Sequence, residues 1–291
     1  MTHPVSGVDH VFLLVEDLDQ SAAHYRKLGF TLSPRGLHSA EKGTANYTII
    51  FEDDYVELLG IVTPTSGNQH QRDMLSDDGE GLRAIAFRIK DAHVAREALA
   101  GLGIRTEPVG EFSRPLPLPD GSEGIAAFAV THFAKGEAPT GFAFMCQHKT
   151  RDMVWRPELK SHANGAVEIA AIVAVGEDSA TMAEGFARLV AGGTVRAVEG
   201  GHEVATGNAA DLHSAAIVVL SPEGAAARYS ADAVAATPLK GLAALRIRVA
   251  DPAATRALLI ANGIAVHDGP EGAIWVAPAH AGGSIMEFVG P

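Results

Sequence analysis

The chain has 291 residues, a formal net charge of −12 and one cysteine, and 47% of its residues are hydrophobic. This length favours about two globular domains. The basic residues are scattered, which argues against a nucleic-acid-binding face. No apolar run reaches the roughly 18 to 20 residues that a membrane span needs, and the first residues lack a signal-peptide pattern. We therefore expect a cytoplasmic protein without a disulfide framework.

The segment 7–30 predicts one strand followed by one helix. Apolar residues alternate through VDHVFLLV, as in a half-buried strand, and Asp17 or Asp19 can cap the helix that follows. Gly29 is suited to end that helix.

Related segments recur along the chain. Segments that begin at Gly81 and Gly241 match the first one, and a weaker copy begins at Gly165. In the three close copies an aspartate follows the first glycine by ten residues, and a second glycine follows it by twenty-two: Asp17, Asp91 and Asp251; Gly29, Gly103 and Gly263. Each copy leaves room for three further strands. The sequence therefore predicts a βαβββ module that is repeated four times.

The repeats predict modules at 7–62, 81–148, 165–222 and 241–289. We expect an N-terminal domain at 1–148, a polar linker at 149–164 and a C-terminal domain at 165–291. In the first module the later strands are expected at 30–36, 45–53 and 55–61. The stretch 110–124 is rich in proline, which is unsuited to a central strand, and we expect it to be a loop with a binding role.

The G-x-D-H-V strand, the helix that ends in L-G-F and the later Y-V-E-L strand resemble the vicinal oxygen chelate superfamily. This superfamily includes glyoxalase I, fosfomycin and bleomycin resistance proteins and extradiol dioxygenases. The resemblance implies an α+β fold in which the four modules pair into two cupped, incompletely closed mixed β-barrels. It covers nearly the whole chain and says more about fold than about reaction.

The resemblance also implies metal ligands on the first and fourth strands of a module. The first-strand positions are His10, Ala84, Glu168 and Ala244 in chain order. On the fourth strands, Glu57 and Glu287 occupy the ligand position in the first and last modules. In the second module this position is expected between Cys146 and His148, and the third module offers no ligand. The expected ligand pattern is therefore incomplete outside the first module.

His10, Glu57 and His148 are the candidate metal ligands, and Glu57 is also the candidate catalytic carboxylate. Two histidines and one carboxylate suit a divalent transition metal such as Fe, Zn, Mn or Ni. The alternatives are that Glu57 lies at a rim, that His10 is a hydrogen-bonded core histidine and that His148 is solvated. Cys146 is expected to be a small core residue.

Arg114 is the candidate substrate-binding residue, because a guanidinium can bind a carboxylate or phosphate in bidentate fashion. In the second half, Glu168 and Glu287 have no histidine partner; carboxylates alone suit a hard cation or proton transfer, or form a salt bridge with Arg246 or Arg248. We expect that half to be mainly structural. Two functions remain open. One is a metal-dependent lyase, isomerase or dioxygenase for a small substrate with vicinal oxygens. The other is a metal-free protein that sequesters a small molecule. A homodimer is compatible with either function and is not required for a complete barrel.

Overall fold

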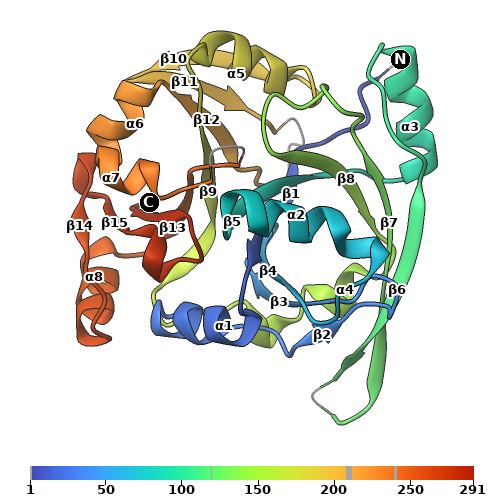
Figure 1. Cartoon of the computed structure of the whole chain (residues 1–291), viewed down its shortest axis with the longest axis horizontal. Helices are drawn as coiled ribbons and strands as arrows, with labels where there is room; N and C mark the ends of the chain where they lie inside the picture. Colours follow the sequence, from blue (N-terminus) through green and yellow to red (C-terminus); the bar gives the residue numbers. More distant parts are fainter. Residues whose placement is uncertain (1, 119, 208–211, 239–240) are drawn as a thin grey trace.

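The computed structural model describes residues 2–118, 120–207, 212–238 and 241–291. In these residues the four expected βαβββ modules form two eight-stranded mixed sheets (Figure 1), which confirms the predicted fold class. Residues 119 and 208–211, inside the predicted second and third modules, lie outside the described residues. The described helices include none that is long and apolar enough to cross a membrane.

The first sheet and its helices come from the first two modules. Their elements are β1 (Val8–Val15), α1 (Leu18–Lys27), β2 (Gly36–Leu37), β3 (Thr44–Ile50), β4 (Tyr55–Ile61), η1 (Ser66–Asn68), α2 (Gln69–Asp78), β5 (Gly81–Arg88), α3 (Ala92–Gly101), β6 (Gly110–Pro117), β7 (Glu123–His132) and β8 (Phe142–His148). The strand order is β2-β3-β4-β1-β5-β8-β7-β6.

The second sheet repeats this arrangement. Two short helices, α4 (Arg151–Val154) and η2 (Pro157–Leu159), come before it. Its elements are β9 (Ala166–Val175), α5 (Ser179–Ala187), β10 (Thr194–Val198), β11 (Gly201–Ala205), β12 (Ala216–Leu220), α6 (Pro222–Tyr229), α7 (Ala231–Ala235), β13 (Ala244–Val249), α8 (Pro252–Ala261), β14 (His267–Asp268), η3 (Pro270–Gly272), β15 (Ile274–Val276), η4 (Pro278–His280) and β16 (Ile285–Val289). The strand order is β10-β11-β12-β9-β13-β16-β15-β14.

The repeated aspartates and glycines mark the helix ends, as predicted. Each aspartate side chain accepts a hydrogen bond from a backbone N–H in the first turn of its helix, which satisfies a donor that the helix itself cannot. The glycines that follow the helices have φ of 89°, 72° and 74°, a conformation that favours glycine. These residues are Asp17, Asp91 and Asp251, and Gly29, Gly103 and Gly263.

The first sheet curves into a nearly closed barrel. Its edge strands, β2 and β6, come into contact, and a Cβ atom on Gly36 would collide with the guanidinium of Arg114. Side chains alternate between the two faces of the sheet. On β1, Val11 and Leu13 belong to the main hydrophobic core, whereas His10 and Phe12 face the barrel interior.

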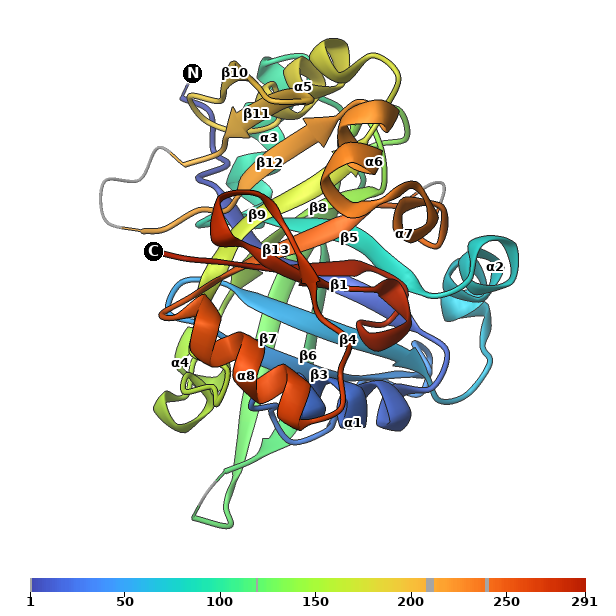
Figure 2. The same ribbon diagram turned by 90° about the vertical axis from the view of Figure 1, so that its left-hand side faces the viewer.

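The two barrels differ in what lies against their concave faces. The segments α2 and α6–α7 follow the equivalent strands β4 and β12. Helix α2 has no buried residue and lies across one mouth of the first barrel (Figures 1 and 2). In contrast, α6 and α7 pack into the second barrel, where Tyr229 joins a buried cluster with Val173 and Trp275. Helix α2 therefore stays outside the first barrel, whereas α6 and α7 fill part of the second.

Two local predictions were wrong. The strand expected at 30–36 is limited to β2, at Gly36–Leu37. The stretch 110–124, expected to be a loop, forms β6 and the start of β7 in a hairpin that projects from the body of the molecule (Figure 2). Strand β6 tolerates Pro115 and Pro117 because it is an edge strand that is hydrogen bonded only to β7.

The two halves share one continuous hydrophobic core. The segment 149–164, expected to be a linker, contains α4 and η2, and its Val154, Trp155 and Leu159 are buried in a cluster of the first half. A direct polar contact between the halves is the hydrogen bond from the backbone N–H of Ile169 to Asp54 Oδ1, at 3.2 Å.

Asp54 is expected to make stability depend on pH. Burial raises the pKa of this fully buried carboxyl group well above its usual value of 3.8, and the bond from Ile169 lowers it only in part. The native state therefore holds a proton that the unfolded state releases. The free energy of unfolding should fall as the pH rises above 3.8 toward the native pKa.

Asp54→Asn keeps the acceptor oxygen but cannot ionise, so it should flatten this part of the pH dependence. Urea unfolding between about pH 5 and pH 8 measures the effect. The exposed Asp77→Asn serves as the control and should keep the wild-type slope. An unchanged slope in Asp54→Asn would contradict the assignment.

Candidate functional site

The interior of the first barrel contains a cavity of about 240 Å³. Alternate residues of β1, β3, β4, β6, β7 and β8 line it, and Gly67 and Gln71 close it at the mouth near α2. Its wall is divided between aromatic side chains and polar ones. The aromatic residues are Phe12, Tyr55, Phe112, Phe128 and Phe144; the main polar residues are His10, His38, Lys42, Asn46, Glu57 and Arg114.

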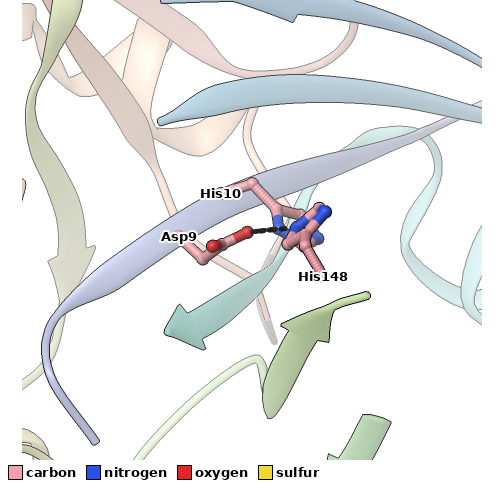
Figure 3. Close-up of side chains that lie close together, drawn as sticks. All are labelled: Asp9, His10 and His148. Carbon is pink, nitrogen blue, oxygen red and sulfur yellow. Dashed lines mark hydrogen bonds and ion pairs between the residues drawn. The ribbon is translucent and has the colours of Figure 1, made fainter. Parts of the chain in front are cut away.

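His10 is held in one orientation by its neighbour in the sequence. Adjacent strand residues normally point to opposite faces, but the pairing of β1 with β5 is shifted at Asp9, which forms a β-bulge. The Asp9 carboxylate consequently reaches His10 Nδ1, with 2.7 Å between Oδ1 and Nδ1 (Figure 3). The His10 ring also stacks on Tyr55, with the ring centroids 4.2 Å apart.

His148 binds the same carboxylate. Its Nε2 lies 2.9 Å from Asp9 Oδ1, so Asp9 joins the two histidines (Figure 3). The Nε atom of Arg88 lies 3.8 Å from the other carboxylate oxygen. Burial by itself would raise the pKa of Asp9, but its contacts with His148 and His10 hold it well below its usual range. Asp9 is therefore an ionised, buried carboxylate.

The bond to Asp9 determines which edge of His10 meets the cavity. An ionised carboxylate can only accept, so Nδ1 of His10 carries the proton and donates it to Asp9. Within the described residues, His10 Nε2 has no hydrogen-bond partner, and it is not among the fully buried polar atoms. His10 lines the cavity, so its Nε2 lone pair opens into that space.

Glu57 lies on the same cavity wall, two residues along β4 from Tyr55. Its Oε1 accepts a hydrogen bond of 2.6 Å from Asn46 Nδ2. His38 lies nearby, and burial lowers its pKa to about 4 against the opposing charge of Glu57. His38 is therefore neutral near pH 7.

The cavity also holds two cations, Lys42 and Arg114. Lys42 Nζ lies 3.2 Å from the ring centroid of Phe112. Burial lowers the pKa of both groups, while the charge of Glu57 raises it. Across the described ranges, neither cation forms an ion pair with a carboxylate. The cavity is therefore suited to an anionic group on a ligand.

The predicted site residues fall into two neighbouring groups. His10, Glu57 and Arg114 line one cavity. His148 approaches His10 from β8 but lines a separate groove near the N-terminus, together with Asp9. The carboxylate between the two histidines is that of Asp9, whereas Glu57 bonds to Asn46.

The strand registers correct two of the expected correspondences. In the first module, Phe12 lies two residues after His10 and pairs with Glu57. In the second module, Ala86 lies two residues after Ala84 and pairs with Phe144. Phe144 therefore holds the fourth-strand position in the second module, rather than a residue between Cys146 and His148. In the third module, Ala171 on β9 pairs with Arg246 on β13, just as His10 on β1 pairs with Ala86 on β5. Ala171 therefore holds the position equivalent to His10. The first-strand position expected at Glu168 therefore carries no ligand.

The fit of a metal depends on which residues are considered. At the positions that the family resemblance implies, Ala84 and Phe144 leave only His10 and Glu57 as donors. A different group, Asp9, His10 and His148, has ligand atoms that all lie within 4.8 Å of one another. Two imidazoles and a carboxylate suit a divalent transition metal. These three residues therefore fit a metal in composition and spacing.

Sequence reasoning missed Asp9, His38, Lys42 and Asn46. Strict alternation along β1 would turn Asp9 away from His10, so the D-H dipeptide by itself gives no signal for their contact. The alternation of β3 contained a usable signal for Asn46, since Thr44, Asn46 and Thr48 share the face that lines the cavity.

With this geometry in hand, comparisons with known proteins identify the family. The model of the glyoxalase-like domain matches residues 8–190, which is more than half of the chain. The chain therefore belongs to the glyoxalase-like domain family of the vicinal oxygen chelate superfamily, as the sequence resemblance implied. A search of curated proteins finds no match.

Solved structures resemble the whole chain at low sequence identity. A hypothetical protein from Staphylococcus aureus matches with a TM-score of 0.62 and 10% identity, over 98% of this chain and 99% of the other. A mutant 4-hydroxymandelate synthase from Streptomyces coelicolor matches with a TM-score of 0.57 and 12% identity, over 99% and 93%. A fusion of a xylose isomerase-like TIM barrel with 4-hydroxyphenylpyruvate dioxygenase matches with a TM-score of 0.57 and 14% identity, over 100% of this chain and 50% of the other. At these identities the likeness establishes the fold alone.

The tautomer of His10 can be measured directly. We expect ¹⁵N NMR of the histidine side chains to show His10 protonated at Nδ1 and bare at Nε2. His162 is an internal control of the opposite tautomer, because its Nδ1 accepts from the backbone N–H of Thr31. Asp9→Asn removes the charge that favours this tautomer of His10 and should leave the His162 signals in place. A wild-type His10 protonated only at Nε2 would contradict the assignment.

Proposed function

We propose that this protein is a glyoxalase-like enzyme that binds a small, oxygen-rich anion in the first barrel and catalyses its isomerisation or cleavage by proton transfer. One observation carries the proposal. Asp9 holds His10 Nδ1 at 2.7 Å, while the opposite nitrogen opens into a cavity that also contains Glu57. A histidine oriented by a buried carboxylate is well suited to act as a general base.

In this mechanism His10 Nε2 takes a proton from a carbon next to a carbonyl group of the substrate. The resulting imidazolium is stabilised by Asp9, which is already ionised and in contact. Glu57 lies on the same wall and is the second group placed to transfer a proton. Stacking on Tyr55 keeps the His10 ring in place during the transfer.

Arg114 and Lys42 would bind the anionic part of the substrate and the negative charge that develops on its oxygen atoms. Both cations lie in the cavity without a carboxylate in contact among the described residues, so their donors are available to a ligand. The aromatic walls exclude water from the reacting atoms. A cavity with two cations and aromatic walls fits a small carboxylic acid, or a related anion, that has neighbouring oxygens.

Hydrogen–deuterium exchange of small 2-oxo and 2-hydroxy carboxylates in D₂O, followed by proton NMR, tests the proposal. His10→Gln should lower the rate of exchange at the acidic carbon by at least about 100-fold, because it removes the base. Arg114→Met should mainly raise KM. His280→Gln, at a histidine in the other half of the chain, is the matched control and should leave the rate unchanged.

Exchange that survives His10→Gln would contradict the assigned base. Binding of these compounds without any exchange would favour the second reading of the sequence, a protein that sequesters a small molecule.

A metal-dependent enzyme is the second candidate, and the grouping of Asp9, His10 and His148 favours it. A divalent transition metal held by these residues would supply Lewis-acid activation. Asp9 and His148 face the groove near the N-terminus rather than the barrel cavity, so Glu57 and Arg114 lie outside this ligand set.

Elemental analysis separates the two candidates. The metal candidate requires about one transition metal per chain, lost in His148→Ala and retained in Glu57→Gln. Proton exchange should then also be sensitive to a chelator. If His10 acts as a base without metal, exchange persists in metal-free protein, and His148→Ala has a weaker effect than His10→Gln.

A further inference from the structure

The second barrel retains a polar cavity of about 320 Å³ beside the part filled by α6 and α7. Three arginines line it: Arg228 from α6, and Arg246 and Arg248 from β13. Arg246 and Arg248 are two residues apart on the strand and therefore share its concave face. This cavity is separate from the one that contains His10.

A fully buried carboxylate anchors two of these arginines. Glu287 on β16 forms a two-pronged ion pair with Arg228, and its Oε2 accepts a hydrogen bond of 2.5 Å from the Tyr229 hydroxyl. Arg246 Nε lies 3.1 Å from the same oxygen. Two guanidinium groups thus share one carboxylate, which leaves one positive charge uncompensated.

The terminal nitrogens of Arg246 are the free donors in this arrangement. Within the described ranges they have no hydrogen-bond partner, and they are not among the fully buried polar atoms, whereas Nε is. Because Arg246 lines the cavity, its terminal N–H groups face that space. Arg246 is thus free to bind an oxyanion in bidentate fashion.

Most of the other charged side chains around the cavity are paired with one another. Arg248 pairs with Glu168, at 2.5 Å between Nε and Oε1. Glu203 pairs with Arg196 on the neighbouring strand, at 2.7 Å. Glu271 is exposed at the rim, where water and salt screen its charge.

We propose that the second barrel is an anion-binding site, in which Arg246, supported by Arg228, binds the carboxylate or phosphate of a small molecule. The proposal is independent of the reaction in the first barrel. It assigns a ligand site to the half of the chain that lacks the His10 position, and it assigns Glu287 the role of holding the arginines rather than of binding a metal.

Calorimetric titration of the full chain with citrate and with inorganic phosphate, at low salt, tests this site. The two probes separate carboxylate from phosphate chemistry. Arg246→Met should weaken the binding of the preferred probe by at least about tenfold, because it removes charged hydrogen bonds. Glu287 keeps Arg228 and Tyr229 as partners in this variant, so the fold should persist. Arg246→Gln is a second variant with a polar side chain, and Arg256→Met, at an arginine on α8 outside the cavity, is the control.

The first barrel also contains cations, so the titrations are repeated in Arg114→Met. Binding that persists in Arg114→Met and Arg256→Met, and is weakened in both Arg246 variants, supports the site. Binding that is lost only in Arg114→Met belongs to the first barrel and overturns the proposal. Absence of binding by both probes, or binding that is unaffected by the Arg246 variants, also overturns it.

Discussion

The site depends on strand β1, which is hydrogen bonded to β4 along one edge and to β5 along the other. Strand β1 runs parallel to β4 and antiparallel to β5, so one of its faces packs on the hydrophobic core and the other faces the barrel interior. Polar groups in such a strand are stable only when they are hydrogen bonded. The bulge at Asp9 meets this requirement, because it brings a buried carboxylate to His10 and His148 and leaves one imidazole nitrogen open to the cavity.

The two halves show how one repeated scaffold can have different interiors. After the fourth strand of the first module, the polar helix α2 remains outside the barrel and leaves the cavity open. After the equivalent strand of the third module, α6 and α7 present Tyr229 and small residues that pack into the barrel. The position of Glu57 is occupied in the last module by Glu287, which is fully buried among arginines. The strand order is the same in both halves, and the segments between the strands determine what occupies each barrel.

Much of the fold could be predicted from the sequence. The aspartate caps, the glycine stops and the alternating strands are local signals, and the structure contains all four modules that they indicate. Strand β6 was predicted to be a loop because it contains prolines. Proline is excluded only from central strands, and β6 lies at the edge of its sheet, which a single sequence does not show. His10, Glu57 and Arg114 were named as candidate site residues from the sequence, and all three line one cavity, although Arg114 lies on β6 rather than in the expected loop. Asp9 was not named, because alternation fails at a bulge.

The sequence by itself determined the repeated module, the helix boundaries and the faces of most strands, because each of these depends on residues within a few positions of one another. The tertiary structure decided which carboxylate contacts the two histidines, since that contact needs the shifted register of β1 against β5 and the approach of β8 from far along the chain. It also decided that aromatic and polar side chains line the cavity of the first barrel and that arginines line the cavity of the second. Both outcomes depend on long-range packing, which local spacing does not encode.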